Sequence, residues 1–566
     1  MKRKMKMFFS MLVIFTLIVS MAGCVTKNND TSKTIDTTGQ VVEKTEKYEI
    51  SWLNFGAQHI VDGNPIEKII EEKFNVDIKV VKADVQDTEK INLMLASGEM
   101  PDVMMPYGNP KEYWDQGLIR SIPFDMVRKY IPGFAKVYDK HPIAWLTSLV
   151  PEKDNEFLGL PAISEGISGP SFVDMWRLDW LENIGVKPHG TLEPIIEGKM
   201  WWTTEPFTFD EMEQIFKAFV NNDPNKNGQK DTYATVGYKD SLLWNYINLA
   251  QSFGLVWSRN LMEDGELKMY YTANAYKEFL KWMSKMYKDG MVDKEITILD
   301  FTKMWEKIAT GNVGYWIVPY SYVGAMPETA PTSPPYSVLV NYPESKVLVT
   351  PPVKGKSGKS IGYQYLELET LASYWTFISS KVSDDKLIKI LQILEYTTFN
   401  SEMRNKVVFG EEGIHWEWSG KPYASSINRL VALGPEQAGE LGVGGTYGAI
   451  NSSYTKEWLT YVETPELNVV ASWIRDPKKG GLISGRSYRY DVFGETNLGE
   501  INKQYGSEIN TQVQEFSYKC ITGQIDVESS WNSYIDKLMR SGLNEMLEEI
   551  KKAPLTDELH KGTVKY

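Results

Sequence analysis

The chain has 566 residues, of which 42% are hydrophobic, 24% charged and 12% aromatic. This length predicts two to four domains or lobes, and the apolar fraction and the mean hydropathy of −0.33 exclude a disordered chain and a polytopic membrane protein. A net charge of −13 argues against nucleic acid as a partner, and two cysteines with five scattered histidines argue against a disulfide scaffold and a Cys- or His-based metal centre.

The first 23 residues predict a lipoprotein signal peptide. Basic residues from Lys2 to Lys6 precede an apolar stretch from Phe8 to Met21. The following Ala-Gly-Cys sequence resembles a bacterial lipobox, so we expect cleavage before Cys24 and lipidation of this cysteine. Such a protein is anchored at the extracytoplasmic face of the cell membrane, as on a Gram-positive cell surface. The alternative is a secreted protein with an accidental cysteine.

Residues 24–46 are polar and lack hydrophobic periodicity, which predicts a flexible tether. The mature chain carries a net charge of −17, because the signal peptide holds four cations and no anions. Its other cysteine, Cys520, is expected to be a buried structural thiol.

Strands and helices alternate after the tether. Apolar alternation predicts strands over residues 48–55, 76–82 and 102–105. Helices are predicted from Asn64-Pro65, which combines a capping residue with Pro at the first helical position, and over 88–97. Strand, helix, strand, helix, strand predicts a parallel α/β unit, with ligands at the carboxyl ends of the strands.

Apolar periodicity continues through the rest of the chain. It predicts helices over 208–220, 273–289, 301–310 and 384–399, and strands over 313–318 and 371–380. A surface loop is predicted for the Pro- and Ser-rich residues 327–337.

Four segments resemble the extracellular solute-binding proteins of ABC importers, family 1, in the subgroup of LipO-like and alginate-oligosaccharide-binding lipoproteins. Residues 91–103 resemble its LASGxxPD segment, 176–186 its RxDWLxxLG segment, 223–231 its DPNxNGxxD loop, and 410–416 a further segment. The resemblance implies a two-lobed α/β fold of the periplasmic-binding-protein type II, with hinge strands between the lobes. It also implies a monomeric carrier, not an enzyme, that delivers an oligosaccharide to the transmembrane subunits of a permease.

On this basis we expect residues 1–23 to be the signal peptide and 24–46 the tether. The N-lobe is predicted over 47–165 and 318–375, and the C-lobe over 166–317 and 376–566.

The 223–231 segment has the pattern of a calcium-binding loop. Oxygen donors stand at positions 1, 3, 5 and 9 of an EF-type loop, Gly228 takes the turn at position 6, and Gln229 offers its carbonyl at position 7. Position 12 is Ala234, so the bidentate Glu is missing. The predicted ligands of a structural Ca²⁺ are Asp223, Asn225, Asn227, Gln229 and Asp231. The alternative is a turn capped by its own side chains.

Aromatic and charged residues near strand ends and in loops are the candidates for saccharide binding, because rings cover the C–H face of a sugar while polar groups bond its hydroxyls. Arg177, Trp316, Glu412 and Trp416 are the strongest candidates by position. The full set is Trp52, Asn54, Tyr107, Trp176, Arg177, Trp244, Trp316, Tyr320, Glu412, His415, Trp416 and Trp418. For any single tryptophan the alternative is core packing, and His415 is expected to hydrogen-bond rather than to bind metal.

Two other functional classes remain open from the sequence. A secreted glycoside hydrolase or lyase would also be large, acidic and rich in aromatic residues, although Glu411 and Glu412 do not by spacing form a catalytic pair. A carrier for peptide or another non-sugar solute is the second alternative.

Overall fold

The computed structural model describes most of the chain after the tether. The described residues are 33–35, 41–43, 47–85, 87–106, 110–140, 143–146, 149–150, 153, 155–164, 172–255, 260–324, 334–356, 358–362, 375–431, 433–449, 453–454, 458, 465–474, 482–483, 488–491, 496–555 and 558. The signal peptide, Cys24 and Tyr107 therefore lie outside the described residues. No helix in the described ranges is long and apolar enough to cross a membrane.

The chain divides into two compact units, Met1–Lys47 and Tyr48–Tyr566. In the first, strands β1 (Lys33–Ile35) and β2 (Val41–Glu43) pair antiparallel, with Thr34 opposite Val42. The predicted tether thus contains a short strand pair, which its β-branched residues favour.

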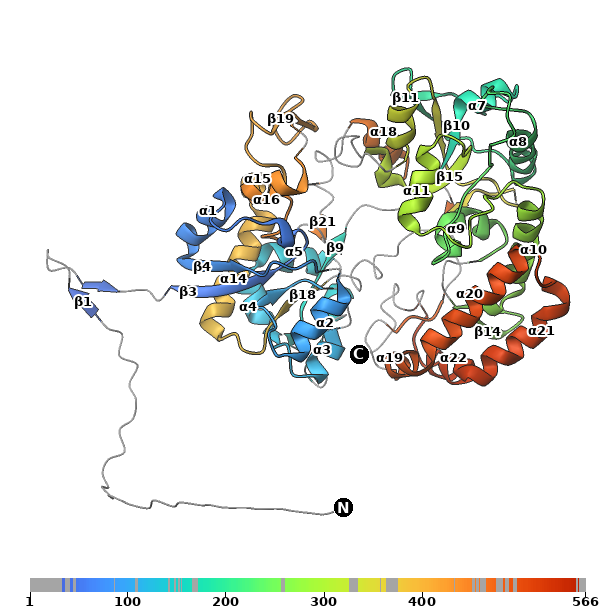
Figure 1. The fold of residues 1–566 in the computed structure, drawn as a ribbon. Coiled ribbons are helices and arrows are strands. Elements are labelled where there is room, and N and C mark those ends of the chain that lie inside the picture. Colours follow the sequence, from blue (N-terminus) through green and yellow to red (C-terminus); the bar gives the residue numbers. More distant parts are fainter. Residues whose placement is uncertain are drawn as a thin grey trace, which may run out of the picture. The chain divides into compact units, whose positions relative to one another are not determined.

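The second unit begins with a five-stranded sheet (Figure 1). Its order is β4 (Val76–Val80), β3 (Tyr48–Leu53), β5 (Val103–Met104), β18 (Trp375–Ile378) and β8 (Leu160–Pro161). Strand β3 is parallel to β4 and β5, whereas β18 runs antiparallel to β5 and β8. The predicted parallel start of the fold is confirmed.

Helices and short strands surround this first sheet. Helix α1 begins as predicted: the side chain of Asn64 accepts the N–H of Glu67, and Pro65 occupies the first turn. Helix α14 packs against β3, α1, α4 and α5. The elements are α1 (Pro65–Phe74), α2 (Thr88–Ala96), α3 (Pro110–Asp115), β6 (Ile122–Pro123), α4 (Phe124–Tyr130), α5 (Pro132–Lys140), α6 (Ile143–Leu146), β7 (Glu156–Phe157), α14 (Asp384–Phe399), α15 (Ser401–Phe409), β19 (Trp416–Trp418), β20 (Ile427–Arg429) and α16 (Pro435–Leu441).

A second five-stranded sheet has the order β11 (Glu193–Ile196), β12 (Met200–Trp202), β16 (Val347–Thr350), β10 (Phe172–Arg177) and β15 (Tyr315–Pro319). Strand β10 runs antiparallel to its neighbours β16 and β15, and all six of its residues are buried. Helix α9 packs on β10 and β15, and α7 packs on β10 and β16. A strand covered in this way exposes no polar face to water.

The helices of this second part include a C-terminal group, α20 to α22, of which α20 and α21 pack against α10 (Figure 1). The predicted capping box of α8 is present, with both bonds between Thr208 and Glu211 formed. The elements are α7 (Leu178–Asn183), α8 (Phe209–Asn221), α9 (Leu242–Ser252), β13 (Asn260–Glu263), β14 (Glu266–Met269), α10 (Asn274–Lys288), α11 (Phe301–Ala309), α12 (Tyr336–Asn341), α18 (Pro465–Ile474), α19 (Leu498–Ile501), α20 (Ser507–Ile521), α21 (Val527–Leu538) and α22 (Asn544–Ile550).

The first sheet has one hydrophobic core, and the second sheet has one hydrophobic cluster on each face, which together we call the second core. The segments that build these cores differ from the predicted lobes. The first core takes residues from 50–160 and 375–458, and the second takes residues from 172–353 and 470–550. Residues 318–353, predicted in the N-lobe, belong to the second core because β15 and β16 both pair with β10. Residues 376–458, predicted in the C-lobe, belong mainly to the first.

Two short strands in the segments between these ranges each pair in parallel with a strand inside one of them. Strand β9 (Ile163–Ser164) pairs with β21 (Ser453–Tyr454), and β17 (Ile361–Gly362) pairs with β22 (Leu482–Ile483). The prediction for Cys520 is confirmed, since it is a free, fully buried cysteine. Burial raises the pKa of its thiol to about 12.

Candidate functional site

Trp52 and Asn54 lie in the first core. Trp52 is fully buried, and its indole N–H donates to the carbonyl of Thr446 at 2.8 Å. The side-chain amide of Asn54 donates to the carbonyl of Gly448 at 2.8 Å and accepts the N–H of Phe55. Both side chains therefore bond the end of β3 and the residue after it to residues 445–448.

Trp176 and Arg177 are buried at the end of β10. Trp176 is fully buried, and its N–H donates to the hydroxyl of Thr350 at 3.3 Å. The guanidinium of Arg177 forms two bonds with Asp179, at 2.9 and 2.6 Å, and a third with the carbonyl of Gly311 at 2.8 Å. Three of the five donors of this guanidinium are thus used within the protein.

The structure brings four predicted residues together in the segment 411–431, which we call the hairpin group. Trp416 and Trp418 stand on β19, with ring centroids 5.4 Å apart and an edge-to-face arrangement. Trp416 is buried and its N–H donates to the carbonyl of Gly410 at 2.9 Å, whereas Trp418 is half-buried. Glu412 is exposed, and its backbone bridges to Trp416.

His415 is fixed within this hairpin group. Its Nδ1 accepts the backbone N–H of Glu411 at 2.9 Å. A Cβ on Gly410 would lie 2.7 Å from that Nδ1, and Gly410 has φ +88°, so only glycine suits this position. The predicted hydrogen-bonding role of His415 agrees with this geometry, which leaves the Nε2–H of the neutral ring as a donor.

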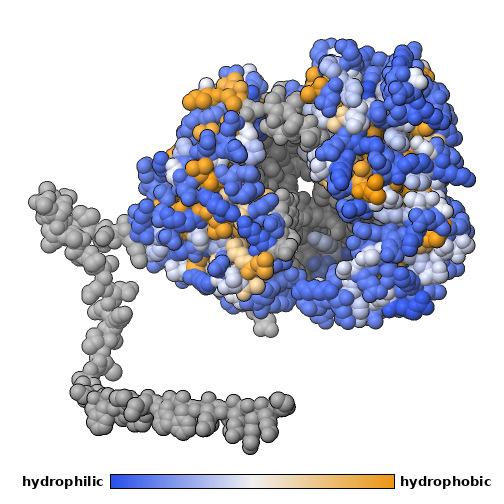
Figure 2. Space-filling model, viewed as in Figure 1, coloured by the Kyte–Doolittle hydropathy of each residue, from blue (hydrophilic) through white to orange (hydrophobic). Residues whose placement is uncertain are grey.

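The hairpin group also exposes apolar surface. Ile414, Leu430 and Val431 are 62%, 45% and 45% exposed, and Figure 2 shows an apolar patch over β19. Tyr423 is also exposed, and its ring lies 4.9 Å from that of Trp418. Exposed apolar residues concentrated on one hairpin are typical of binding surfaces.

A second aromatic assembly lies in the second core around the predicted residue Trp244. It comprises five half-buried residues, which we call the five-ring group: Tyr238, Trp244, Phe301, Trp305 and Tyr322. Ring centroids are 5.1 Å apart for Trp244 and Phe301, 4.5 Å for Phe301 and Trp305, and 5.4 Å for Trp305 and Tyr322.

The predicted residues Trp316 and Tyr320 lie deeper in the same cluster, at 3% and 8% exposure. Sequence reasoning missed Tyr238, Phe301, Trp305 and Tyr322. Phe301 and Trp305 are four residues apart on a predicted helix, a spacing that places them on one face and could have indicated the pair.

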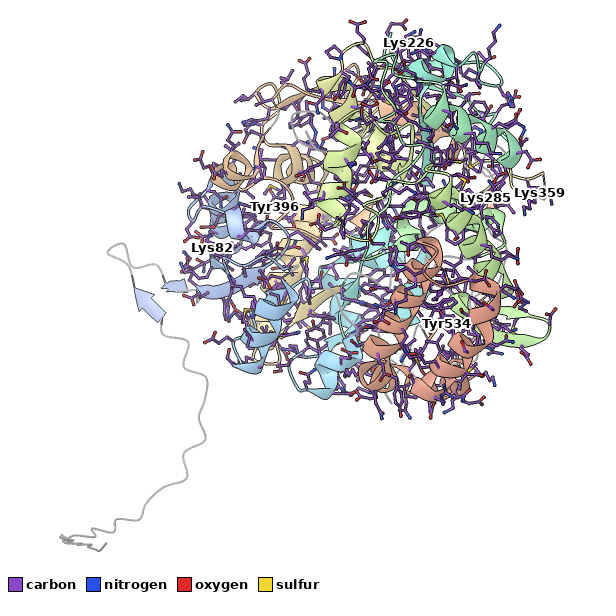
Figure 3. All side chains as sticks on the ribbon, turned by 45° about the vertical axis from the view of Figure 1, so that its right-hand side comes forward. Lys82, Lys226, Lys285, Lys359, Tyr396 and Tyr534 are labelled. Atoms are coloured by element: carbon purple, nitrogen blue, oxygen red, sulfur yellow. The ribbon has the colours of Figure 1, made fainter. Side chains whose placement is uncertain are left out.

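The 223–231 loop follows α8 and has the predicted turn. Asp223, Lys226 and Gly228 have positive φ, and Lys226 is labelled in Figure 3. The carboxylate of Asp223 accepts the N–H groups of Asn227 and Gly228, at 3.1 and 3.0 Å. The carboxylate of Asp231 accepts the side-chain amides of Asn225 and Asn227, at 3.2 and 2.9 Å.

The donor set of this loop is mostly neutral. Among the described residues, no three His, Cys, Asp or Glu side chains cluster as a metal site. The loop brings together two carboxylates with asparagine oxygens. The Oδ1 atom of Asn225 is buried and has no hydrogen-bond partner in the described part of the chain.

A buried carboxyl group lies in the second sheet. Asp174, on β10, is fully buried and accepts hydrogen bonds from the side-chain amide of Asn248 at 2.8 Å and from the N–H of Val353 at 2.9 Å. Burial raises the pKa of this carboxyl to about 7, and this effect is larger than that of the two hydrogen bonds, which lower the pKa.

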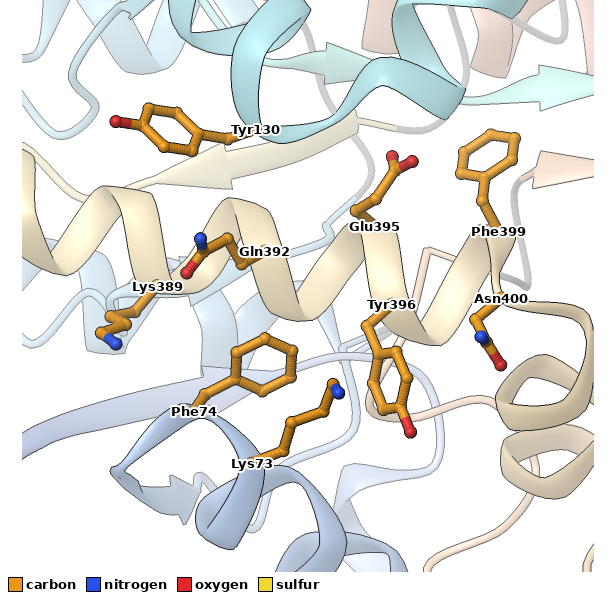
Figure 4. A pocket seen from close by; sticks show the side chains of 9 residues that line it. All are labelled: Lys73, Phe74, Tyr130, Lys389, Gln392, Glu395, Tyr396, Phe399 and Asn400. Carbon is orange, nitrogen blue, oxygen red and sulfur yellow. The ribbon is translucent and has the colours of Figure 1, made fainter.

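A pocket of about 610 Å³ lies beside α14 in the first core (Figure 4). Lys73 Nζ lies 4.6 Å above the ring of Tyr396, and Glu395 accepts the N–H of Gly133 at 2.8 Å. None of the predicted site residues lines this pocket. Its lining is Lys73, Phe74, Tyr130, Lys389, Gln392, Glu395, Tyr396, Phe399 and Asn400.

Comparison with known proteins gives relatives that span most of the chain. No family model matches the chain. Lipoprotein LipO of Bacillus subtilis (strain 168) is 21% identical over 502 residues, covering 87% of this chain and 89% of LipO. The fructooligosaccharide ABC transporter substrate-binding protein FusA of Streptococcus pneumoniae is 23% identical over 429 residues, covering 69% of this chain and 74% of FusA.

Solved structures share the fold. An HMO-binding solute-binding protein of an ABC transporter, from Bifidobacterium longum infantis, gives a TM-score of 0.66 at 16% identity, covering 90% of this chain and 98% of its own. The alginate-binding protein AlgQ2 without calcium ion gives 0.61 at 18% identity with the same coverage. An EF-hand mutant of FusA with fructo-nystose gives 0.63 at 17% identity, again with that coverage.

These likenesses confirm the predicted two-lobed α/β fold. Over most of its length the chain is similar to LipO and to a substrate-binding protein of an ABC transporter, the kind of protein that its four sequence segments resemble.

Proposed function

We propose that the protein captures an oligosaccharide outside the cell and delivers it, chemically unchanged, to the transmembrane subunits of an ABC importer. The relatives support this assignment, since they are binding proteins: FusA is named for fructooligosaccharide and YtcQ of Bacillus subtilis for polygalacturonan and rhamnogalacturonan. The mature protein is a monomer that reaches the membrane through its lipid anchor on Cys24.

The observation that carries the proposal is the five-ring group. Five aromatic side chains that are half-buried, rather than fully packed, leave ring surface accessible at one place in the second core. The C–H face of a sugar ring packs on an aromatic face, so this group suits a saccharide. Trp244 is its member from the predicted set, with Trp316 and Tyr320 behind it.

The hairpin group supplies the polar counterpart. Trp418 offers a half-buried ring, Glu412 an exposed carboxylate that accepts sugar hydroxyls, and His415 an Nε2–H that donates to them. Trp416 supports Trp418 from behind. Trp52, Asn54, Trp176 and Arg177 act through the packing described above, not through contact with solute.

We propose that the 223–231 loop holds a structural Ca²⁺. Asp223 and Asp231 supply carboxylate oxygens, Asn225 and Asn227 side-chain oxygens, and Gln229 its backbone carbonyl. The buried Oδ1 of Asn225, which has no partner among the described residues, fits this role. Bound calcium would neutralise the two carboxylates and fix the turn. Two related structures mention calcium or an EF-hand in their names, which agrees with the proposal.

Melting temperature tests the calcium proposal. We expect 1 mM EGTA to lower the melting temperature of the protein, and calcium, but not magnesium, to restore it. The variant Asp223→Asn should melt at one temperature in EGTA and in calcium. An unchanged melting temperature of the wild type in EGTA would exclude the site.

A secreted carbohydrate-active enzyme is the second candidate function. Glu411 pairs with Lys406 at 3.0 Å, and Glu412 is exposed. Neither geometry resembles two carboxyl groups facing each other across a scissile bond. Prolonged incubation of the pure protein with each test oligosaccharide, followed by mass spectrometry, separates the functions: cleaved sugar would establish the enzyme and refute the carrier.

A thermal-shift screen tests solute binding. The panel is kestose and Man5GlcNAc, which are bound in related structures, and trigalacturonate. A sugar at 100 times its Kd adds about 2.7 kcal/mol to the unfolding free energy. Trp244→Ala and Trp418→Ala should weaken binding at least tenfold. Trp201→Ala, a half-buried tryptophan outside both groups, should not. No shift with any panel member would count against an oligosaccharide carrier, and a shift with peptides instead would favour the peptide alternative.

A further inference from the structure

Tyr238, at the edge of the five-ring group, is carried by a segment without secondary structure of its own. Residues 236–240 form neither helix nor strand before α9 begins at Leu242. Its backbone is bonded to the second core by the N–H of Lys239, which donates to the carbonyl of Leu299 at 2.9 Å. A segment of this kind needs further bonds to hold a side chain in one place.

Two side chains of the C-terminal helix α20 provide such bonds. The hydroxyl of Tyr518 donates to the carbonyl of Tyr238 at 2.8 Å, and the amide of Gln514 donates to the carbonyl of Asp240 at 3.3 Å. The two residues are four positions apart, so they lie on one face of α20. Burial raises the pKa of the Tyr518 hydroxyl, which therefore remains a donor at physiological pH.

The position of this segment sets the place of one ring. The ring of Tyr238 lies 5.4 Å from that of Phe301 and 6.4 Å from that of Trp244, edge-to-face in both cases. These contacts fix its orientation only if its backbone is held. The bond from Tyr518 ends on the carbonyl of Tyr238 itself, so it acts directly on the residue that carries the ring.

We propose that Tyr518 and Gln514 are positioning residues for solute binding, through which α20 sets the edge of the five-ring group. The inference rests on the proposed function, because it assumes that this group contacts the sugar. Neither residue touches the solute. Loss of one neutral hydrogen bond to this segment is expected to weaken binding about three- to tenfold.

The test compares Tyr518→Phe with Tyr534→Phe in the full mature protein. Tyr534 lies in the C-terminal helices (Figure 3) and also donates to a backbone carbonyl, that of Tyr271 at 3.1 Å, away from the five-ring group. The two substitutions remove the same atom from similar bonds. Each variant is titrated by calorimetry with the panel sugar that shifts the wild type most, among kestose, Man5GlcNAc and trigalacturonate.

We expect Tyr518→Phe to raise the Kd about three- to tenfold and to speed hydrogen exchange at residues 236–241. Tyr534→Phe should change the melting temperature by a similar amount but leave the Kd and this exchange unchanged. Gln514→Ala provides a second variant, with a smaller effect in the same direction. Equal Kd values for Tyr518→Phe and wild type would overturn the inference and leave the proposed function standing. A wild type that binds no panel sugar would instead overturn the function.

Discussion

Replacing Asp174 by asparagine should remove a dependence of stability on pH. The carboxyl of Asp174 is fully buried, and burial raises its pKa from 3.8 to about 7. Between these two values the folded protein keeps a proton on Asp174 that the unfolded chain has released. The free energy of unfolding therefore falls as pH rises through this range, and it is constant, for this group, below pH 3.8 and above about pH 7.

The size of the effect follows from the two pKa values. Their difference corresponds to about 4 kcal/mol, of which about 3 kcal/mol falls between about pH 4.5 and 7.5. Asparagine keeps an oxygen that can accept the N–H of Val353. The new amide group of the variant faces Asn248, whose Oδ1 is buried without a partner among the described residues. A 180° rotation of the Asn248 side-chain amide lets this Oδ1 accept a hydrogen bond from the new amide.

Urea unfolding of wild type and Asp174→Asn at several pH values measures this effect. The difference between the two proteins cancels the titration of all other groups. It should shift by about 3 kcal/mol in favour of the variant from about pH 4.5 to 7.5. A constant difference for Asp174→Asn over the same range would refute the reasoning.

Three further predictions concern packing and reactivity. Arg177→Met should lower the unfolding free energy by about 3 kcal/mol, because it breaks a largely buried ion pair. Arg128→Met breaks an exposed ion pair and should lower it by less than about 1 kcal/mol. Equal losses for the two variants in urea unfolding would contradict this prediction. Gly314→Ala should lower the unfolding free energy by about 1–3 kcal/mol, because the new Cβ would lie 2.3 Å from the ring of Phe219. Gly499→Ala should leave the unfolding free energy unchanged, because the nearest atom to its new Cβ is 3.7 Å away. An unchanged unfolding free energy for Gly314→Ala would show that the ring can move. Cys520 should resist iodoacetamide in the folded protein and react after unfolding, as judged by mass spectrometry; rapid labelling of the folded protein would show that the thiol is not buried.

Local signals in the sequence were sufficient to predict most elements. The cap at Asn64-Pro65, the capping box at Thr208 and the periodicity of residues 384–399 each specify a helix through bonds within a few residues. The alternation after Tyr48 likewise predicted a strand, and four short segments carried the resemblance to solute-binding proteins. These features depend only on neighbours along the chain, so no tertiary contact was needed to recognise them.

Which segments share a core was decided by strand pairing. Strands β15 and β16 both pair with β10, which lies more than a hundred residues earlier in the chain, so residues on both sides of the boundary predicted near residue 318 share one core. The same holds for the site. Periodicity cannot separate a buried ring such as Trp52 from a half-buried one such as Trp244, because burial depends on what packs from elsewhere.

The sequence by itself thus determined the local elements, the resemblance to solute-binding proteins and the loop with calcium-like spacing, since each depends on adjacent or regularly spaced residues. Only the tertiary structure decided that Tyr238, Trp244, Phe301, Trp305 and Tyr322 form one surface, and that Tyr518, nearly three hundred residues away, holds its edge. Such contacts join residues that are distant along the chain, so no local sequence pattern predicts them.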